Sequence, residues 1–250
     1  MDAVTVTESS IGYLDGLRRL PLVSPAALLA GRHLVVVAPH PDDESLGLGG
    51  LLAAAASEAA GTTVVFLTDG EASHVGSATY PPQRLARVRR REAIDALGAL
   101  GIPASAAHFL GLGDGRLAAL DSLQVTAVVK RLGALLPDAP TLLCVTADTD
   151  PHGDHRAAGK FVRLLPLREA TEVMHYPVWT WAVPETGLPD VAASGVRVDI
   201  ADYLAAKRRA VAAHRSQQGL VVHDAREAFV LAPEFLERFL GPTETLIWPA

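Results

Sequence analysis

The chain has very little cysteine, since Cys144 is the only one among its 250 residues. A single cysteine excludes an intrachain disulfide and suits a reducing compartment, so we expect a cytoplasmic protein. The sequence also lacks the apolar run of about 20 residues that a membrane-spanning helix needs, and its first residues lack the basic and apolar regions of a signal peptide. Basic residues are not in excess, because the net charge is −6. Nucleic-acid-binding surfaces are basic, so we expect no nucleic-acid partner.

Histidine and acidic residues gather at one point early in the chain. The apolar run His33–Ala38 is typical of a buried strand in a parallel sheet, and the segment Pro39–Glu44, which reads P-H-P-D-D-E, follows it directly. Open α/β sheets have their sites just beyond the carboxyl ends of such strands. The residue types and their position predict metal chemistry, and therefore an enzyme.

A second cluster of the same kind follows the apolar run 141–146 and spans Thr149–His155. If the two strands are neighbours in one sheet, His40, Asp43 and His155 can supply three protein ligands to one ion. A fourth position then stays open for water, as in catalytic zinc sites. Two histidines and one carboxylate also suit ferrous iron. The sequence therefore predicts a Zn²⁺ site, with Fe²⁺ as the alternative.

Both clusters resemble the signature of the LmbE-like, or PIG-L-type, zinc-dependent N-acetylglucosaminyl deacetylases, which is P-H-P-D-D-E early and H-x-D-H later. Gly153 stands where many relatives have proline, a departure that leaves the ligands untouched. The resemblance covers roughly residues 33–217. Further matches occur in the family's order at Leu67–Glu71, Arg89 with Glu92, Ala96–Gly98, Phe109–Asp114, Lys207 with Ala210, and His214–Gln217.

The resemblance and the chemistry of amide hydrolysis assign roles to individual residues. Asp42 is next to the ligands but is not needed as one, so it can accept the proton of the attacking water, the role that the resemblance also implies. His152 is the candidate to protonate the leaving amine, with either Asp154 or Asp150 to orient it. By the resemblance, Arg89 and Asp114 can contact the substrate sugar.

Each assignment has a plainer structural alternative. Asp43 or Ser45 could simply cap the following helix, and Asp42 and His152 could be ordinary loop residues. Arg89 lies in an arginine-rich stretch and could form a solvated ion pair on a helix face, while Asp114 could be a turn residue. Other residues are expected to serve packing. Cys144 is expected in the core, and Gly47–Gly50 is expected to allow close packing of helix on sheet rather than to bind a dinucleotide. Lys207 and His214 could either pack or line a pocket.

The pattern along the chain predicts a doubly wound α/β fold, with a mostly parallel Rossmann-like sheet and helices on both faces. We expect a leader at residues 1–30 packed on a single domain at residues 31–250, and a loop at residues 177–196 that contributes to the pocket wall. Strands are expected near 33–38, 62–68, 106–110, 141–146 and 172–178, and helices near 46–60, 82–101, 120–136, 154–166, 200–214 and 233–240.

The sequence thus favours a metal-dependent hydrolase that removes an N-acyl group, by resemblance an acetyl group, from a small amino sugar or a glycoconjugate. A metal-dependent phosphoesterase is the nearest alternative enzyme, although paired histidines suit Mg²⁺ poorly. A catalytically silent glycan-binding or metal-binding module on the same fold is the other alternative. The sequence does not fix the oligomeric state, so a homo-oligomer stays open.

Overall fold

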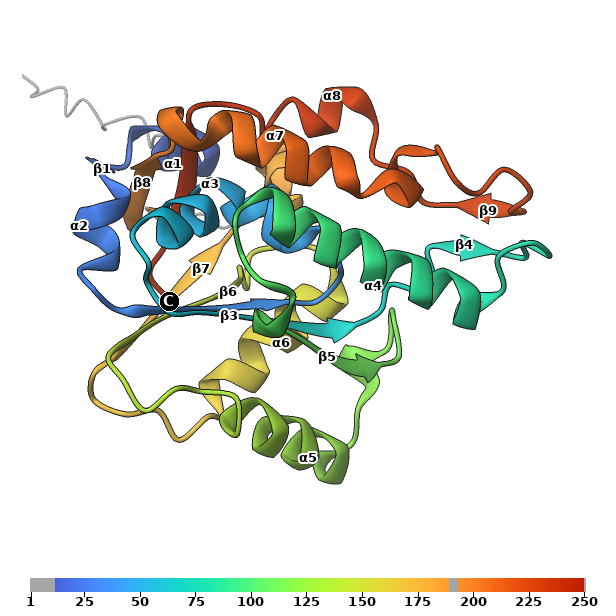
Figure 1. Cartoon of the computed structure of the whole chain (residues 1–250), viewed down its shortest axis with the longest axis horizontal. Coiled ribbons are helices and arrows are strands. Elements are labelled where there is room, and N and C mark those ends of the chain that lie inside the picture. Colours follow the sequence, from blue (N-terminus) through green and yellow to red (C-terminus); the bar gives the residue numbers. More distant parts are fainter. Residues whose placement is uncertain (1–11, 189–192, 250) are drawn as a thin grey trace, which may run out of the picture.

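Parallel strands form the centre of the molecule (Figure 1). The structure is a computed structural model, and it describes residues 12–188 and 193–249. The main sheet has eight strands in the order β1-β8-β10-β7-β6-β2-β3-β5. All its pairings are parallel except those of β10, which runs antiparallel to both β7 and β8. Its strands are β1 (Leu22–Val23), β2 (His33–Ala38), β3 (Thr62–Thr68), β5 (Ala107–Leu112), β6 (Thr141–Thr146), β7 (Thr171–Tyr176), β8 (Gly195–Asp199) and β10 (Thr243–Ile247).

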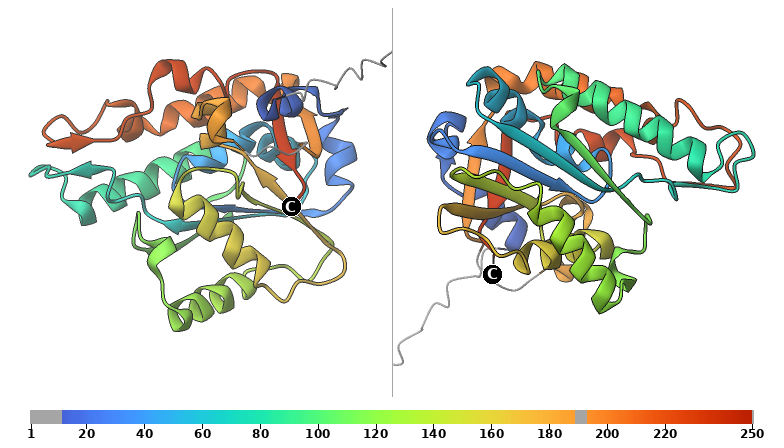
Figure 2. Two further views of the ribbon diagram at one scale, coloured as in Figure 1. Left: turned by 180° about the vertical axis from the view of Figure 1, so that it is seen from behind. Right: turned by 60° about the horizontal axis from the view of Figure 1, so that its bottom comes forward.

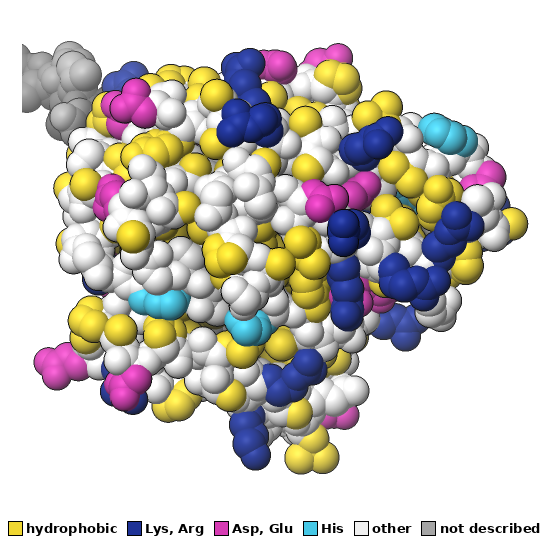
Figure 3. Space-filling view, viewed as in Figure 1, with side chains coloured by type: hydrophobic (Ala, Val, Ile, Leu, Met, Phe, Trp, Pro, Cys, Tyr) yellow, Lys and Arg dark blue, Asp and Glu magenta, His cyan; other side chains and the backbone are white. Residues whose placement is uncertain are grey.

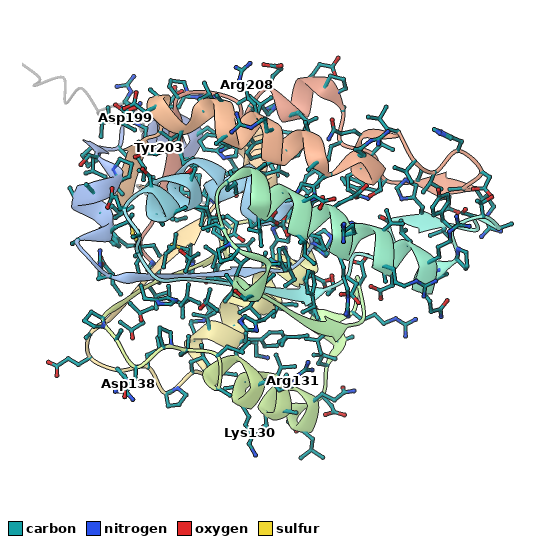
Figure 4. The ribbon with its side chains drawn as sticks, viewed as in Figure 1. Lys130, Arg131, Asp138, Asp199, Tyr203 and Arg208 are labelled. Atoms are coloured by element: carbon teal, nitrogen blue, oxygen red, sulfur yellow. The ribbon has the colours of Figure 1, made fainter. Side chains whose placement is uncertain are left out.

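Helices cover both faces of this sheet, as Figures 1 and 2 show. One face carries α3 (Asp43–Ser57), α4 (Pro82–Ala99), α7 (Leu204–Ala213) and the short α8 (Pro233–Leu236), and the other carries α5 (Ser122–Gly133) and α6 (Gly153–Arg163). Figure 4 shows Arg208 on α7 and Lys130 on α5 at opposite sides of the molecule. Arg131, next to Lys130, ties α5 to the sheet because its Nη2 donates to the Leu110 carbonyl oxygen at 2.7 Å.

Side chains that alternate between the two faces of the central strands build one hydrophobic core on each face of the sheet. In β2, Val36 packs on the side of α3, whereas Val35 and Val37 pack on the side of α6. Successive side chains of a strand point to opposite faces, so a strand that is apolar at every position must be covered twice. The predicted doubly wound α/β fold is therefore confirmed. Cys144 belongs to the α3 side and is fully buried, so its predicted place in the core is confirmed too.

Close contact between α3 and its neighbours depends on glycine. A Cβ at Gly47 would lie 2.3 Å from Cδ2 of Tyr176, and one at Gly50 would lie 2.5 Å from Cβ of Ile200. Real Cβ atoms do not approach other atoms so closely, so only glycine fits at these two positions. The packing role predicted for Gly47–Gly50 is confirmed.

The five predicted strands are present with small shifts at their ends, but three other strands of the main sheet, and both strands of the β4–β9 ribbon (His74–Val75 and Glu227–Ala228), were missed. Residues 195–199 and 243–247 form β8 and β10, and residues 22–23 form β1. β8 and β10 each have only five residues and include charged side chains, so neither shows the apolar run that marks β2. The expected loop at 177–196 therefore ends in a strand and contains the 3-10 helices at Trp179–Ala182 and Glu185–Gly187.

The described part of the predicted leader contacts the rest of the chain. The helix α1 (Tyr13–Arg19) buries Leu17 beside Ile247, β1 pairs with β8, and α2 (Pro25–Leu29) packs on the α3 side of the sheet. Residues 1–11 of that leader lie outside the described residues. Within the described ranges, no helix has the length and hydropathy needed to cross a membrane. The remaining elements are the small ribbon of β4 (His74–Val75) and β9 (Glu227–Ala228) and the 3-10 helices Ala104–Ala106, Leu117–Ala119, Ala201–Tyr203 and Arg215–Gln218.

Candidate metal centre

The two polar clusters meet where the direction of the sheet reverses. From β2 the chain proceeds outward to β3 and β5 on one side, and it later returns to β6 and β7 on the other side of β2. Loops that leave adjacent strands in opposite directions open a crevice at their carboxyl ends, which is where open α/β sheets bind ligands. His40 follows β2 and His155 lies in the first turn of α6, after β6.

The three predicted ligands lie at metal-ligand spacing. Asp43 Oδ2 is 3.2 Å from His40 Nδ1 and 3.3 Å from His155 Nε2. A tetrahedral zinc ion with bonds of about 2.0–2.1 Å separates its donor atoms by about 3.3 Å. His155 Nε2 is also buried without a hydrogen-bond partner among the described residues. A buried ring nitrogen is normally satisfied, so a cation at this point would complete the site.

Each of these two histidines has a carboxylate on its other nitrogen. Asp150 Oδ2 lies 2.7 Å from His155 Nδ1, and His40 Nε2 is 3.3 Å from Asp154 Oδ2 and 3.2 Å from Asp114 Oδ1. Such partners fix the tautomer and orientation of a ligand histidine. Burial lowers the pKa of His155, but Asp43 and Asp150 outweigh this effect and raise that pKa to about 9. The carboxylates that stabilise positive charge on His155 would also favour a bound cation.

His152 lies beside the ligands, but its orienting partner differs from the expected one. Its ring centroid is 4.9 Å from that of His40 and 5.0 Å from that of His155. The expected contact from the Asp150 or Asp154 carboxylate is not made. Asp150 holds His155, while Asp154 accepts from the backbone N–H groups of Gly115 and Leu117 and faces His40.

A backbone group orients His152 instead. His152 is the N-cap residue of α6, and its Nδ1 accepts from the N–H of Asp154 at 3.2 Å. The neutral ring must then carry its proton on Nε2. Burial lowers the pKa of His152, so the neutral form is favoured. One ring nitrogen from each of His40, His152 and His155 lies within 4.8 Å of the other two, so His152 is close enough to act on a molecule bound at the centre.

Asp42 is held in a strained conformation next to the ligands. Its φ of 143° is outside the regions that side-chain-bearing residues normally adopt, and such strain is common at functional sites. The backbone N–H of Asp42 donates to Glu44 Oε2 at 2.9 Å, and Oδ2 accepts from Arg89 Nη2 at 3.0 Å. Burial raises the pKa of Asp42 to about 6, and Arg89 opposes that rise.

The alternative in which Asp43 only caps the helix is wrong. Asp42 occupies the N-cap position of α3, yet its side chain accepts no hydrogen bond from the helix, and the Asp43 carboxylate instead faces His40 and His155.

Arg89 is buried rather than solvated, so the surface ion-pair alternative for it is wrong. Its side chain is 3% exposed and donates to the carbonyl oxygens of Gly70 and Pro41 as well as to Asp42. Gly70 is required here, because its φ is +66° and a Cβ would lie 1.9 Å from Arg89 Nη1. Arg89 thus braces the loop that carries Asp42.

Asp114 faces the centre from the far end of β5. Its Oδ1 is 3.2 Å from His40 Nε2, and its Oδ2 accepts from the N–H of Ala72. Burial acts to raise the pKa of Asp114, but the hydrogen bond to His40, the charges of His40 and Arg89 and the N–H of Ala72 together lower it to about 2. Asp114 does lie in a turn, as the plainer alternative expected, but its carboxylate also faces His40 at the centre.

The segment His214–Gln217 supports the site from a distant part of the chain. His214 Nε2 is 3.1 Å from Glu44 Oε1, and Glu92 accepts from both the N–H and the hydroxyl of Ser216. These contacts place Gln217 at the cavity. Lys207, by contrast, pairs with Glu244 and has a packing role.

A cavity of about 290 Å³ opens onto the centre. The expectation that the 177–196 segment contributes to its wall is confirmed by Val178 and Trp179. Phe229 and Leu231 were missed, since neither belongs to a recognisable pattern and their roles depend on contacts between distant segments. The lining residues are His40, Asp42, Asp43, Leu46, Ala72, Ser73, Arg89, Asp114, Gly115, His152, Val178, Trp179, Gln217, Phe229 and Leu231.

Comparison with known proteins finds one matching family and relatives that are named as deacetylases. The PIG-L family, described as GlcNAc-PI de-N-acetylase, matches residues 35–166. The chain is 40% identical over 86 residues to 1D-myo-inositol 2-acetamido-2-deoxy-alpha-D-glucopyranoside deacetylase 1 of Catenulispora acidiphila, a match that spans 32% of this chain and only 27% of that protein. It is 26% identical over 201 residues to a probable N-acetyl-alpha-D-glucosaminyl L-malate deacetylase 2 of Bacillus cereus, which spans 77% of this chain and 87% of the relative.

Solved structures share the fold. A conserved protein from Thermus thermophilus is 28% identical, with a TM-score of 0.62 over 87% of this chain and 94% of that one. The 4-carboxy-2-hydroxymuconate hydratase of Pseudomonas putida is 18% identical, with a TM-score of 0.63 over 88% of this chain and 97% of that one. The same fold thus occurs in a hydratase, so the reaction must be argued from the site and not from the fold.

Proposed function

The chain belongs to the PIG-L family, and we propose from its site that it is a metal-dependent deacetylase that removes the N-acetyl group of an amino sugar or glycoconjugate. Supporting this, relatives that cover most of the chain are named as deacetylases of N-acetylated glucosamine compounds. The observation that carries the proposal is the position of Asp43 Oδ2 between His40 Nδ1 and the unpartnered His155 Nε2, with Asp42 adjacent.

His40, Asp43 and His155 would hold Zn²⁺, or Fe²⁺ as the alternative, because two imidazoles and one carboxylate suit both ions. Such an ion acts as a Lewis acid on an amide carbonyl and acidifies a water molecule. Asp150 and Asp154 orient the two ligand histidines, and their charge keeps a cation favourable in a buried place.

Asp42 accepts the proton of the attacking water. It lines the cavity, it is adjacent to a ligand, and its oxygen is held by Arg89 rather than by the ligand set. A general base works best when its pKa is near the working pH, and burial moves the pKa of Asp42 in that direction, to about 6.

His152 acts on the charge that develops on the amide oxygen. A neutral imidazole with its proton on Nε2 can donate a hydrogen bond to the developing oxyanion. The proton that Asp42 takes from the water is the one available for the leaving amine, because a neutral ring that lost its Nε2 proton would become an imidazolate. The backbone N–H of Asp154 sets this tautomer, while the Asp154 side chain acts on His40. Asp154 is therefore a positioning residue in this proposal.

Arg89 and Asp114 line the same cavity and offer a donor and an acceptor of opposite charge. We place both near the sugar hydroxyls, although Arg89 also holds Asp42 and Asp114 also faces His40.

The test is amine release from N-acetylglucosamine compounds by protein treated with a chelator and then resupplied with Zn²⁺ or Fe²⁺. The proposal expects amine release that disappears on chelation and returns with one of the two ions. Release that persists without metal would contradict it. Phosphate release from p-nitrophenyl phosphate without amine release would favour the phosphoesterase, and metal binding with neither activity would favour a silent module.

A further inference from the structure

The cavity at the metal centre has an apolar wall that the proposed chemistry does not use. Leu46, Val178, Trp179, Phe229 and Leu231 line it together with the polar residues described above. Trp179 and Phe229 meet edge to face, with ring centroids 5.4 Å apart. Trp179 is fixed from behind, because Phe235 stacks on it at 4.6 Å. The aromatic wall is therefore built to keep its shape.

This wall continues outward onto an exposed apolar rim. Phe229 is 41% exposed, Val230 is 40% exposed and Val75 is 43% exposed. They lie together because β9 pairs with β4 and the N–H of Phe229 donates to the Ser73 carbonyl oxygen at 2.7 Å. Leu220, which is 55% exposed, lies just after Gln217 in the chain. The N–H of Leu231 donates to the Gln217 carbonyl oxygen, and this bond joins the Leu220 segment to the residues that follow β9.

Figure 3 shows hydrophobic side chains among Lys and Arg side chains at the end of the molecule where the β4–β9 ribbon lies. Large apolar side chains that gather on a surface mark binding sites, whereas single ones need no explanation. These residues adjoin a pocket rather than a flat face, so the ligand that enters the pocket is the natural occupant of the rim.

An N-acetylated sugar alone does not account for this surface. Its hydroxyl groups need hydrogen-bonding partners, which Arg89, Asp114 and Gln217 offer, and the methyl of its acetyl group would lie at the metal centre, which leaves Trp179 and Phe229 uncovered. An apolar group attached to the sugar would cover Trp179, Phe229 and the rim while the acetamido group lies at the metal centre.

We propose that the substrate is an N-acetylated amino sugar with an apolar aglycone, and that Trp179 and Phe229 form the subsite that binds this aglycone. The inference rests on the proposed deacetylase function and adds the substrate class to it. Phe229 is the specificity-determining residue of the pair, because it belongs to both the cavity and the exposed rim.

The test compares methyl and hexyl N-acetylglucosaminides, in both anomers, as substrates. Burial of only two or three methylene groups corresponds to roughly a tenfold gain or more in kcat/KM for the hexyl compound. Phe229→Ala should remove most of this preference, so that the ratio of kcat/KM for the hexyl compound to kcat/KM for the methyl compound falls towards one. Leu123→Ala is the matched control, because Leu123 is 80% exposed on α5 and does not line the cavity.

Equal kcat/KM for the two glycosides in the native protein would overturn the proposal, as would an undiminished preference in Phe229→Ala. Calorimetric binding of the same two compounds separates this inference from the proposed function. If neither compound releases amine, the deacetylase proposal fails for these sugars, yet tighter binding of the hexyl compound that depends on Phe229 still supports the subsite. Equal binding would overturn it.

Discussion

Asp150 Oδ2 lies 2.7 Å from Nδ1 of His155, and both side chains are fully buried. The same carboxylate accepts from the N–H groups of Val178 and Thr180 and from the Thr180 hydroxyl. Asp150 therefore holds a metal-ligand candidate on one side and, on the other, the segment that carries Trp179 of the cavity wall. One buried carboxylate fixes both the ion site and part of the substrate pocket.

Replacement of this carboxylate should weaken metal binding. Asp150→Asn keeps the size of the side chain but removes the charge that fixes the Nδ1–H tautomer of His155, so we expect metal affinity to fall by roughly 10–100-fold. Competition with a chromophoric chelator measures this without reference to activity. Thr180→Val is the control, since it removes the hydroxyl contacts to Asp150 and Thr149 but leaves the charge of Asp150 in place. Equal metal affinity in Asp150→Asn and the native protein would contradict the orienting role.

Asp42→Asn should separate metal binding from turnover. The amide can still accept from Arg89, but it cannot take a proton, so we expect kcat to fall by about 10²–10⁴-fold while metal content stays unchanged. The measurement is kcat beside elemental analysis of the same preparation. A fully active variant with its metal in place would remove Asp42 from the mechanism.

A buried ion pair supports the helix that begins at the metal centre. The backbone of α3 is non-helical at Leu48, and beyond this kink the N–H groups of Gly50 and Leu51 donate to the Glu244 carboxylate, which also pairs with Lys207 at 2.7 Å. Glu244 thus acts as a cap for the second part of α3, supplied from β10.

Lys207→Met should leave Glu244 charged and without its cation in the core. We expect a loss of about 3–5 kcal/mol in the free energy of unfolding, measured with urea. Adding Glu244→Gln should recover part of this loss, because it removes the uncompensated charge. A Lys207→Met protein as stable as the native one would show that the pair has no such role.

Two glycine-to-alanine changes should have opposite effects on the stability of the folded protein. Gly47→Ala forces a methyl group against Tyr176 and should cost about 1–3 kcal/mol in stability. Gly98→Ala, in α4, meets no atom within 4 Å and should stabilise the protein by up to about 1 kcal/mol, since alanine favours the helix. Thermal unfolding compares them, and equal shifts in Tm would contradict the packing account of α3.

The parts of this molecule that could be predicted were those with a local signal. The apolar runs of β2 and β6 and the His and Asp residues after them placed His40, Asp43 and His155 at one crevice, because parallel neighbouring strands bring their carboxyl ends together. β10 could not be predicted in this way. It is short, and its buried Glu244 makes sense only beside Lys207 and the kink in α3.

Partners of the polar residues were equally beyond local reasoning. Spacing suggested that Asp150 or Asp154 orients His152. Which histidine each carboxylate contacts depends on how the chain turns into α6. In the structure Asp150 contacts His155, and Asp154 contacts His40. Phe229 reaches the cavity from a segment near the end of the chain, through the pairing of β4 and β9, and strands of two residues leave no recognisable pattern in the sequence.

The most direct test of the central claim is the metal content of the purified protein, measured by elemental mass spectrometry together with amine release, for the native chain, His155→Ala and His223→Ala. His223 is exposed and does not line the cavity, so its variant controls for the loss of a histidine. The account predicts about one zinc or iron per chain and amine release in the native protein and His223→Ala, with both lost in His155→Ala. A His155→Ala protein that keeps its metal and its activity would contradict the account.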